Sequence, residues 1–159
     1  MIILGLDPGT AITGYGVIRV VNFKISCIAY GVIRTPAEMP MPKRLQMIYE
    51  DLGQVISQYH PDEVAIEKLY FGRNVTTGIS VGQARGVLLL RLAQANLPIG
   101  EYTPPQIKRA LSGYGGAEKQ QMQYMVQNFL KLPEIPQPDD AADALAIAIC
   151  HAHSRSGLR

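Results

Sequence analysis

A chain of 159 residues with 47% hydrophobic content can bury a core, and we expect a single domain over residues 1–159. We expect the tail after about residue 154 to be disordered. No apolar run reaches the ~18–20 residues of a membrane span, so no membrane-spanning helix is expected. No basic region precedes the N-terminal apolar stretch, and neither cysteine belongs to a CxxC pair. A cytoplasmic protein without a signal peptide and with reduced thiols is therefore predicted.

The net charge of +2 hides an uneven distribution of charge along the sequence. Between Lys68 and Lys131 there are eight basic residues and two acidic ones, whereas the flanking segments hold seven basic and eleven acidic ones. A basic middle segment suits a polyanion such as a nucleic acid. Charge alone leaves open the alternative of an ordinary solvated face that carries lysines.

The first third of the chain has the pattern of three consecutive strands followed by a helix. The predicted elements are strands at residues 2–6, 14–21 and 24–34 and a helix at residues 43–59. Asp7 follows the first apolar run directly, and Pro8-Gly9-Thr10 then turns the chain. A carboxylate at the end of a central strand is poorly solvated and needs hydrogen-bond donors or a cation. We therefore expect a metal site to be assembled around Asp7.

A short apolar strand that ends in a carboxylate recurs at residues 63–67, where the last residue is Glu67. The later predicted elements are a helix at 77–96, a strand at 98–102, and helices at 104–111, 117–130 and 139–153. Three strands followed by alternating helices and strands are typical of an α/β fold. The expected architecture is a five-stranded mixed sheet flanked by helices on both faces.

The helix predicted at residues 77–96 carries Gly78, Gly82 and Gly86 on one face. Each glycine inside a helix costs about 1 kcal/mol relative to alanine. A stripe of three glycines therefore indicates that another backbone approaches closely, either from the sheet or from a partner subunit.

Two further carboxylates, Asp140 and Asp143, are three residues apart and share one face of the last predicted helix. Alanines surround them, so this helix can lie close to the sheet and bring them to Asp7 and Glu67. Four carboxylates in one place repel each other, and a divalent cation removes that repulsion. An all-oxygen ligand set favours Mg²⁺ or Mn²⁺ over zinc.

Two neighbouring polar residues have simpler interpretations than metal binding. Asp139 is assigned to N-capping and to compensation of the helix dipole. His151 is placed at the helix end rather than among the ligands, although it could share the face of Asp143.

Several sequence blocks together resemble the bacterial RuvC Holliday-junction resolvases. The blocks are Ile3-Leu-Gly-Leu-Asp-Pro-Gly-Thr10 with Gly14-Tyr-Gly16, Ala65-Ile-Glu67, Gly82-Gln-Ala-Arg-Gly86, Ala117-Glu-Lys119 and Asp140-Ala-Ala-Asp-Ala-Leu-Ala146. They occur in order along nearly the whole chain. The resemblance implies an RNase H-like fold, a homodimer, and metal-dependent cutting of two opposing strands of a four-way DNA junction in recombination and repair. It also implies the RuvA and RuvB branch-migration proteins as partners.

The resemblance also assigns roles to individual residues. Asp7, Glu67, Asp140 and Asp143 fall on the catalytic carboxylates of the family, which would hold two Mg²⁺ ions per site, with Mn²⁺ as a substitute. Hydrolysis would leave 5′-phosphate and 3′-hydroxyl ends. Lys108 and Lys119 fall on basic positions that the family uses near the DNA, and Tyr70, with Phe71 next to it as the alternative, falls on an aromatic position at the junction centre. Besides these, the basic residues Lys68, Arg73 and Arg109 are expected to neutralise backbone phosphates.

Three alternatives stay open at this stage. The nearest is another RNase H-type nuclease that acts on a different nucleic acid. A second is a phosphate-binding protein of the actin and sugar-kinase type, because Leu6-Asp-Pro-Gly-Thr10 resembles the first phosphate loop of those proteins. Such proteins need a second large domain, which 159 residues cannot supply. The third is a DNA-binding module that has lost its chemistry.

Overall fold

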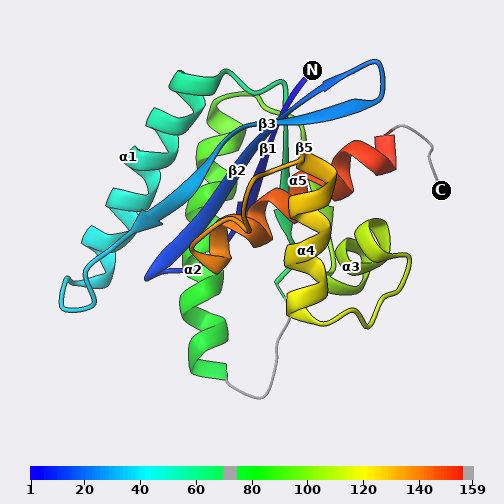
Figure 1. Cartoon of the computed structure of the whole chain (residues 1–159). Helices are drawn as coiled ribbons and strands as arrows, with labels where there is room; N and C mark the ends of the chain where they lie inside the picture. Colours follow the sequence, from blue (N-terminus) through cyan, green and yellow to red (C-terminus); the bar gives the residue numbers. More distant parts are fainter. Residues whose placement is uncertain (70–74, 156–159) are drawn as a thin grey trace.

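The computed structural model describes residues 1–69 and 75–155, which form a five-stranded sheet between two layers of helices (Figure 1). The strands are β1 (Ile2–Asp7), β2 (Ile12–Val21), β3 (Lys24–Arg34), β4 (Glu63–Glu67) and β5 (Ile99–Tyr102). The helices are α1 (Met41–Tyr59), α2 (Val75–Gln94), α3 (Pro104–Ser112), α4 (Lys119–Leu130) and α5 (Asp139–Arg155). The predicted α/β order is confirmed, and the element ends differ from the prediction by only a residue or two. Among the described residues, no helix has the length and apolar character needed to cross a lipid bilayer.

The strand order is β3-β2-β1-β4-β5, so the sheet is mixed. β1 pairs antiparallel with β2 and parallel with β4, and β5 runs parallel to β4. Leu6 of β1 lies opposite Ile66 of β4. Asp7 and Glu67, each one residue further on, are the last residues of these neighbouring parallel strands. They therefore lie side by side at the carboxyl ends of the strands, which form one edge of the sheet.

The two faces of the sheet bury two separate apolar cores. Leu4 and Leu6 of β1 pack with buried residues of α1 and α2, whereas Ile3 packs with buried residues of α3, α4 and α5. Because successive side chains of a strand point to opposite faces, Asp7 lies on the same face as Ile3. Glu67 lies two residues after Ala65, which packs in the same core as Ile3, so Glu67 is on that face of the sheet as well. The layer of α3, α4 and α5 covers this face of the sheet (Figure 1), so the alternation of side chains directs both carboxylates toward that layer.

Glycines in the strands allow α5 to lie unusually close to the sheet. A Cβ atom at Gly5 would collide with the carbonyl oxygen of Ala144, and one at Gly14 would collide with that of Asp140. Any larger residue at these two positions would push the helix away. The predicted close approach of the alanine-rich helix to the sheet is confirmed. This close packing determines how far the acidic first turns of α5 lie from the strand ends.

The glycine stripe of α2 does not pack against the sheet. Ala84 and Leu88 are among the buried residues of α2, and Gly82 and Gly86 precede them by two positions. Two positions correspond to about 200° around a helix, which is the opposite side. A Cβ atom at Gly86 would meet nothing within 4 Å, and one at Gly82 would make only an ordinary contact with Leu69. The expectation that the sheet approaches this stripe is therefore wrong for Gly82 and Gly86, and the partner-subunit alternative stays a prediction.

Candidate active site

Asp7, Glu67 and Asp143 line one open pocket at the edge of the sheet, together with Lys108 and Lys119. The pocket has a volume of about 270 Å³. No sequence pattern marked the remaining lining residues as part of a site; they are Pro104, Ile107, Met122, Ala146 and Ile147. The carboxylates come from the ends of β1 and β4 and from α5, so residues far apart in the sequence meet here as predicted.

The fourth predicted carboxylate, Asp140, lies one turn before Asp143 on α5 and does not line the pocket. Its charge is nevertheless close enough to raise the pKa of Asp7 and of Asp143. Asp140 therefore flanks the pocket and adds to its negative potential.

Asp7 is the carboxylate that is hardest to ionise. Its burial, followed by the charges of Asp143, Glu67 and Asp140, raises the pKa of Asp7 from 3.8 to about 8. The ammonium group of Lys119 acts in the opposite direction. An anionic Asp7 at neutral pH thus needs more positive charge than the pocket itself supplies.

The two other lining carboxylates are perturbed in the same direction. Burial and then the charge of Asp143 raise the pKa of Glu67, and Lys108 lowers it. Burial raises the pKa of Asp143, and Lys119 lowers it. Lys108 therefore compensates part of the charge of Glu67, whereas Lys119 compensates part of the charge of both Asp7 and Asp143.

The donor chemistry of the pocket fits a hard divalent cation, because carboxylate oxygens are the ligands that Mg²⁺ and Mn²⁺ prefer. Within residues 1–69 and 75–155, however, no three side chains of His, Cys, Asp or Glu stand in an arrangement that could hold a metal ion. The carboxylates share a pocket and repel each other, so they would have to move closer together to bind one ion.

Two contacts from α2 hold the ends of β1 and β4 in place. Arg85 donates from Nε to the backbone oxygen of Glu67 at 2.9 Å, and its guanidinium group pairs with Glu101. Thr10, in the turn after β1, donates to the backbone oxygen of Ser80 at 2.8 Å, and the two hydroxyl oxygens lie 2.6 Å apart. These roles were not predictable from the sequence, because contacts between distant side chains and backbone leave no periodic signal.

Lys119 is the basic residue of the pocket with two ion-pair partners. Its Nζ atom lies 3.0 Å from Oδ2 of Asp139 and 3.8 Å from Oδ2 of Asp143. The hydrogen bond to Asp139 raises the pKa of Lys119. Asp139 is the first residue of α5, and its Oδ1 accepts a hydrogen bond from the Gln123 amide at 3.0 Å. The predicted N-capping role of Asp139 is therefore wrong, whereas its place in the first turn agrees with dipole compensation.

The remaining predicted DNA contacts divide into two groups. Lys68 directly follows β4, and Arg109 follows Lys108 on α3; both have exposed side chains outside the lining of the pocket. Three predicted residues lie outside the described part of the chain: Tyr70, Phe71 and Arg73.

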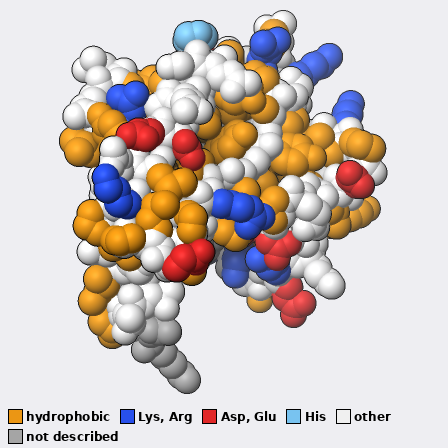
Figure 2. All heavy atoms as spheres, turned by 90° about the vertical axis from the view of Figure 1, so that its left-hand side faces the viewer, with side chains coloured by type: hydrophobic (Ala, Val, Ile, Leu, Met, Phe, Trp, Pro, Cys, Tyr) orange, Lys and Arg blue, Asp and Glu red, His pale blue; other side chains and the backbone are white. Residues whose placement is uncertain are grey.

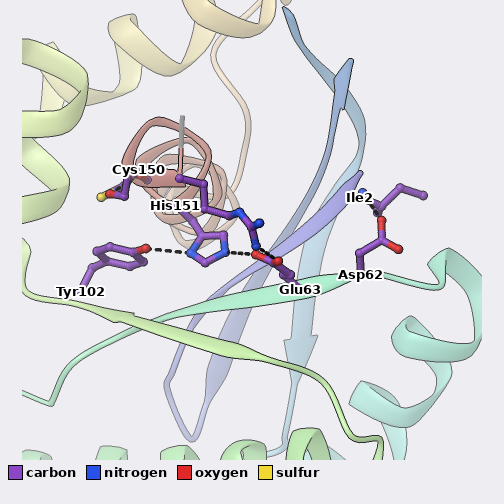
Figure 3. A network of polar contacts seen from close by, with 8 residues as sticks. Ile2, Asp62, Glu63, Tyr102, Cys150 and His151 are labelled. Carbon is purple, nitrogen blue, oxygen red and sulfur yellow. Dashed lines mark hydrogen bonds and ion pairs between the residues drawn. The ribbon is translucent and has the colours of Figure 1, made fainter. Parts of the chain in front are cut away.

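His151 lies near the end of α5, as predicted, but it is buried, with 7% of its surface exposed. Figure 3 shows its ring between Tyr102 and Glu63, with Nδ1 2.7 Å from the Tyr102 hydroxyl and Nε2 2.7 Å from the Glu63 carboxylate. Arg155 pairs with the same carboxylate. The ring fits because Gly100 has no side chain, since a Cβ atom there would lie 2.5 Å from Nδ1. The network joins α5 to the start of β4, the opposite end of that strand from the pocket.

Comparisons with known proteins agree on one family. The family model for "Crossover junction endodeoxyribonuclease RuvC" matches residues 3–151. Proteins of that name from Heliobacterium modesticaldum and Desulfitobacterium hafniense are each 58% identical over 97% of this chain, and the alignments cover 95% and 93% of those proteins. The solved structure of T. thermophilus RuvC in complex with a Holliday junction substrate is 35% identical, covers 99% of this chain and 97% of its own, and gives a TM-score of 0.92. The predicted RNase H-like fold is thereby confirmed, and the chain belongs to the RuvC family of crossover junction endodeoxyribonucleases.

Proposed function

We propose that this chain is a structure-selective endonuclease that resolves four-way DNA junctions by nicking two opposing strands. The observation that carries the proposal is the pocket in which Asp7, Glu67 and Asp143 meet Lys108 and Lys119. Three carboxylates can bind a divalent cation, and the two lysines beside them can bind the negative charge of a phosphodiester. Family membership and the junction-bound T. thermophilus relative support a four-way junction as the substrate.

The catalytic set that we propose consists of Asp7, Glu67, Asp140 and Asp143, with Mg²⁺ as the cofactor, two ions per site, and Mn²⁺ as a substitute. The raised pKa of Asp7 supports this assignment, because a bound cation would favour its ionised form. When bound, the metal ions would generate hydroxide from water and stabilise the leaving 3′ oxygen. The expected products have 5′-phosphate and 3′-hydroxyl ends, which a ligase can reseal.

The basic residues would hold the DNA against this pocket. Lys108 and Lys119 line it, so their ammonium groups would neutralise the phosphates nearest the cut. Lys68 and Arg109 are exposed beside it and would contact the flanking backbone. Because each neutralised phosphate releases counterions, junction affinity should fall steeply as salt rises. Arg73 belongs to the same proposal, and Tyr70 or Phe71 would stack on a base at the junction centre.

A homodimer matches a substrate in which two equivalent strands are cut, since a two-fold axis presents two equal sites. One exposed face of α2, which includes two glycines of the stripe, supports this arrangement. Its residues are Val75, Ile79, Gly82, Gly86 and Leu90, at spacings that keep them on one side of the helix. Its three larger members are exposed in the single chain. Figure 2, viewed from the side of α1, shows hydrophobic side chains gathered along the lower left of the molecular surface. RuvA and RuvB, which move the junction, are the proposed further partners.

The decisive experiment is a competition in Mg²⁺ between a four-way DNA junction, linear duplex DNA and an RNA–DNA hybrid. We expect paired nicks in the junction and at most slow cleavage of the other two. Asp7→Asn should keep junction binding and lose cleavage, whereas Glu134→Gln, an exposed acidic residue, should keep both. Preferred cleavage of the hybrid would instead favour the alternative of another RNase H-type nuclease. Cleavage by Asp7→Asn at the normal rate would refute the carboxylate assignment.

A further inference from the structure

Lys119 is held mainly by an acidic residue that does not belong to the four catalytic carboxylates. The distance from its Nζ to Oδ2 of Asp139 is 3.0 Å, against 3.8 Å to Oδ2 of Asp143. We propose that Asp139 is a positioning residue, which fixes the Lys119 ammonium group at the rim of the pocket where the DNA phosphate is bound. This inference rests on the proposed function, because it needs Lys119 to act on the phosphate.

Asp139 is itself fixed, so it can serve as an anchor. Its Oδ1 accepts a hydrogen bond from Nε2 of Gln123 at 3.0 Å, while its Oδ2 pairs with Lys119. Lys119 and Gln123 are four residues apart on α4 and therefore lie on one helix face. Both oxygens of Asp139 thus bind α4, and the first turn of α5 is clamped to the first turn of α4.

Helix stability does not explain why a lysine stands at this position. Lys119 is the first residue of α4, and the positive end of a helix dipole disfavours a cation there. The first turn of α4 holds no acidic residue, and the preceding Glu118 makes no side-chain capping hydrogen bond. The compensation for Lys119 comes from α5, where both of its ion-pair partners lie. A lysine at this position therefore destabilises α4, as expected for a residue that is kept for its function rather than for helix stability.

Without Asp139, the ammonium group would lose its nearer partner. The Lys119 side chain is 56% exposed, and a long side chain that is half exposed samples many rotamers unless an ion pair restricts it. Asp143 would then be the remaining partner, and a closer pair with Lys119 would occupy an oxygen of a proposed metal ligand. Asp139 thus performs two tasks, since it directs the ammonium group and leaves Asp143 available.

The test is to measure binding and cleavage separately in Asp139→Asn. Loss of a negative charge next to the DNA should leave junction affinity in EDTA unchanged or make it tighter. The single-turnover cleavage rate at saturating protein in Mg²⁺ should fall about tenfold or more, because a displaced group loses catalytic effect steeply. Asp139→Glu should restore part of the rate. Glu134→Gln removes an equal charge from an exposed residue that makes none of the ion pairs of Lys119, and should cleave at the wild-type rate.

Two further measurements decide whether Asp139 acts through Lys119. In a Lys119→Ala background, Asp139→Asn should cause no additional loss of cleavage rate. In the metal-free protein, an amine-reactive ester should modify Lys119 several-fold faster in Asp139→Asn than in wild type, with Lys24 as the internal reference. If Lys119→Ala cleaves too slowly to measure, the labelling rate decides the question.

The inference and the proposed function fail in different ways. An unchanged labelling rate of Lys119, or an unchanged cleavage rate in Asp139→Asn, overturns the positioning role while wild-type protein still cuts junctions. An equal loss in the presence and absence of Lys119 overturns it as well. If wild-type protein does not cut junctions at all, the proposed function fails first.

Discussion

Replacing Asp7 by asparagine should stabilise the metal-free protein at alkaline pH. The pKa of Asp7 is raised from 3.8 to about 8 in the fold, so this carboxyl group takes up a proton on folding throughout that interval. A folded-state pKa above the unfolded value means that the group's contribution to stability falls as pH rises from about 4 to 8. A shift of roughly four units at ~1.36 kcal/mol each sets a ceiling of about 5–6 kcal/mol.

We expect a measured gain of about 1–3 kcal/mol at pH 8, because the asparagine amide is also a polar group in a buried place. For a chain of this length, 1 kcal/mol corresponds to about 2–4 °C in the unfolding midpoint. The assay is thermal and urea unfolding in EDTA at pH 5, 6.5 and 8, with Glu134→Gln as the matched loss of an exposed charge. Wild type should lose stability across this series, and Asp7→Asn should lose less.

Divalent metal provides the second half of this test. Mg²⁺ or Mn²⁺ should raise the unfolding midpoint of wild type at pH 8, because a ligand that binds only the folded state stabilises it. It should have much less effect on Asp7→Asn. The reasoning is refuted if wild-type stability is flat from pH 5 to 8 in EDTA and Asp7→Asn is less stable than wild type at pH 8.

Three further substitutions test how the pocket is held together. Gly14→Ala should lower the unfolding free energy by about 1–3 kcal/mol and slow cleavage, because its new methyl group would displace α5 from the sheet; urea unfolding and a junction assay check this. Arg85→Leu should cost about 1–3 kcal/mol by leaving the Glu67 carbonyl without its donor, and should slow cleavage more than it weakens junction binding measured in EDTA. His151→Ala should also cost about 1–3 kcal/mol, yet at a permissive temperature its cleavage rate should equal that of wild type.

The positions of the strand-end carboxylates were predictable because local patterns determine them. A short apolar run followed by Asp7 and a Pro-Gly turn defines both where β1 ends and where the chain reverses. The same pattern places Glu67 at the end of β4, and parallel pairing then brings both to one edge. Asp143 was predictable because alanines beside it indicated a helix that lies close to the sheet.

Contacts between side chains of different elements were not predictable in the same way. The pairing of Lys119 with Asp139 depends on how α4 meets α5, and no periodicity in either segment records that angle. His151 was expected at a helix end with no indication of burial, because nothing in its own helix shows that Gly100 leaves a space for its ring. The glycine stripe of α2 was detected correctly, but a stripe does not reveal what lies opposite it.

The pocket combines an unfavourable charge arrangement with the most deeply buried helix of the fold. α5 carries Asp143 at the pocket and, on the following turns, Leu145, Ile147 and Ile149, each at most 1% exposed. Full burial of such a side chain contributes about 1.5–3 kcal/mol, so these three offset a cost as large as the ceiling for ionising Asp7, which arises from its burial first and from the neighbouring carboxylates second. Because the same helix provides both, its apolar residues cannot move toward solvent without carrying the carboxylate away from the strand ends. The stability of the α5 core and the alignment of the pocket are therefore one structural property, and substitutions that loosen this core should impair cleavage before they unfold the protein.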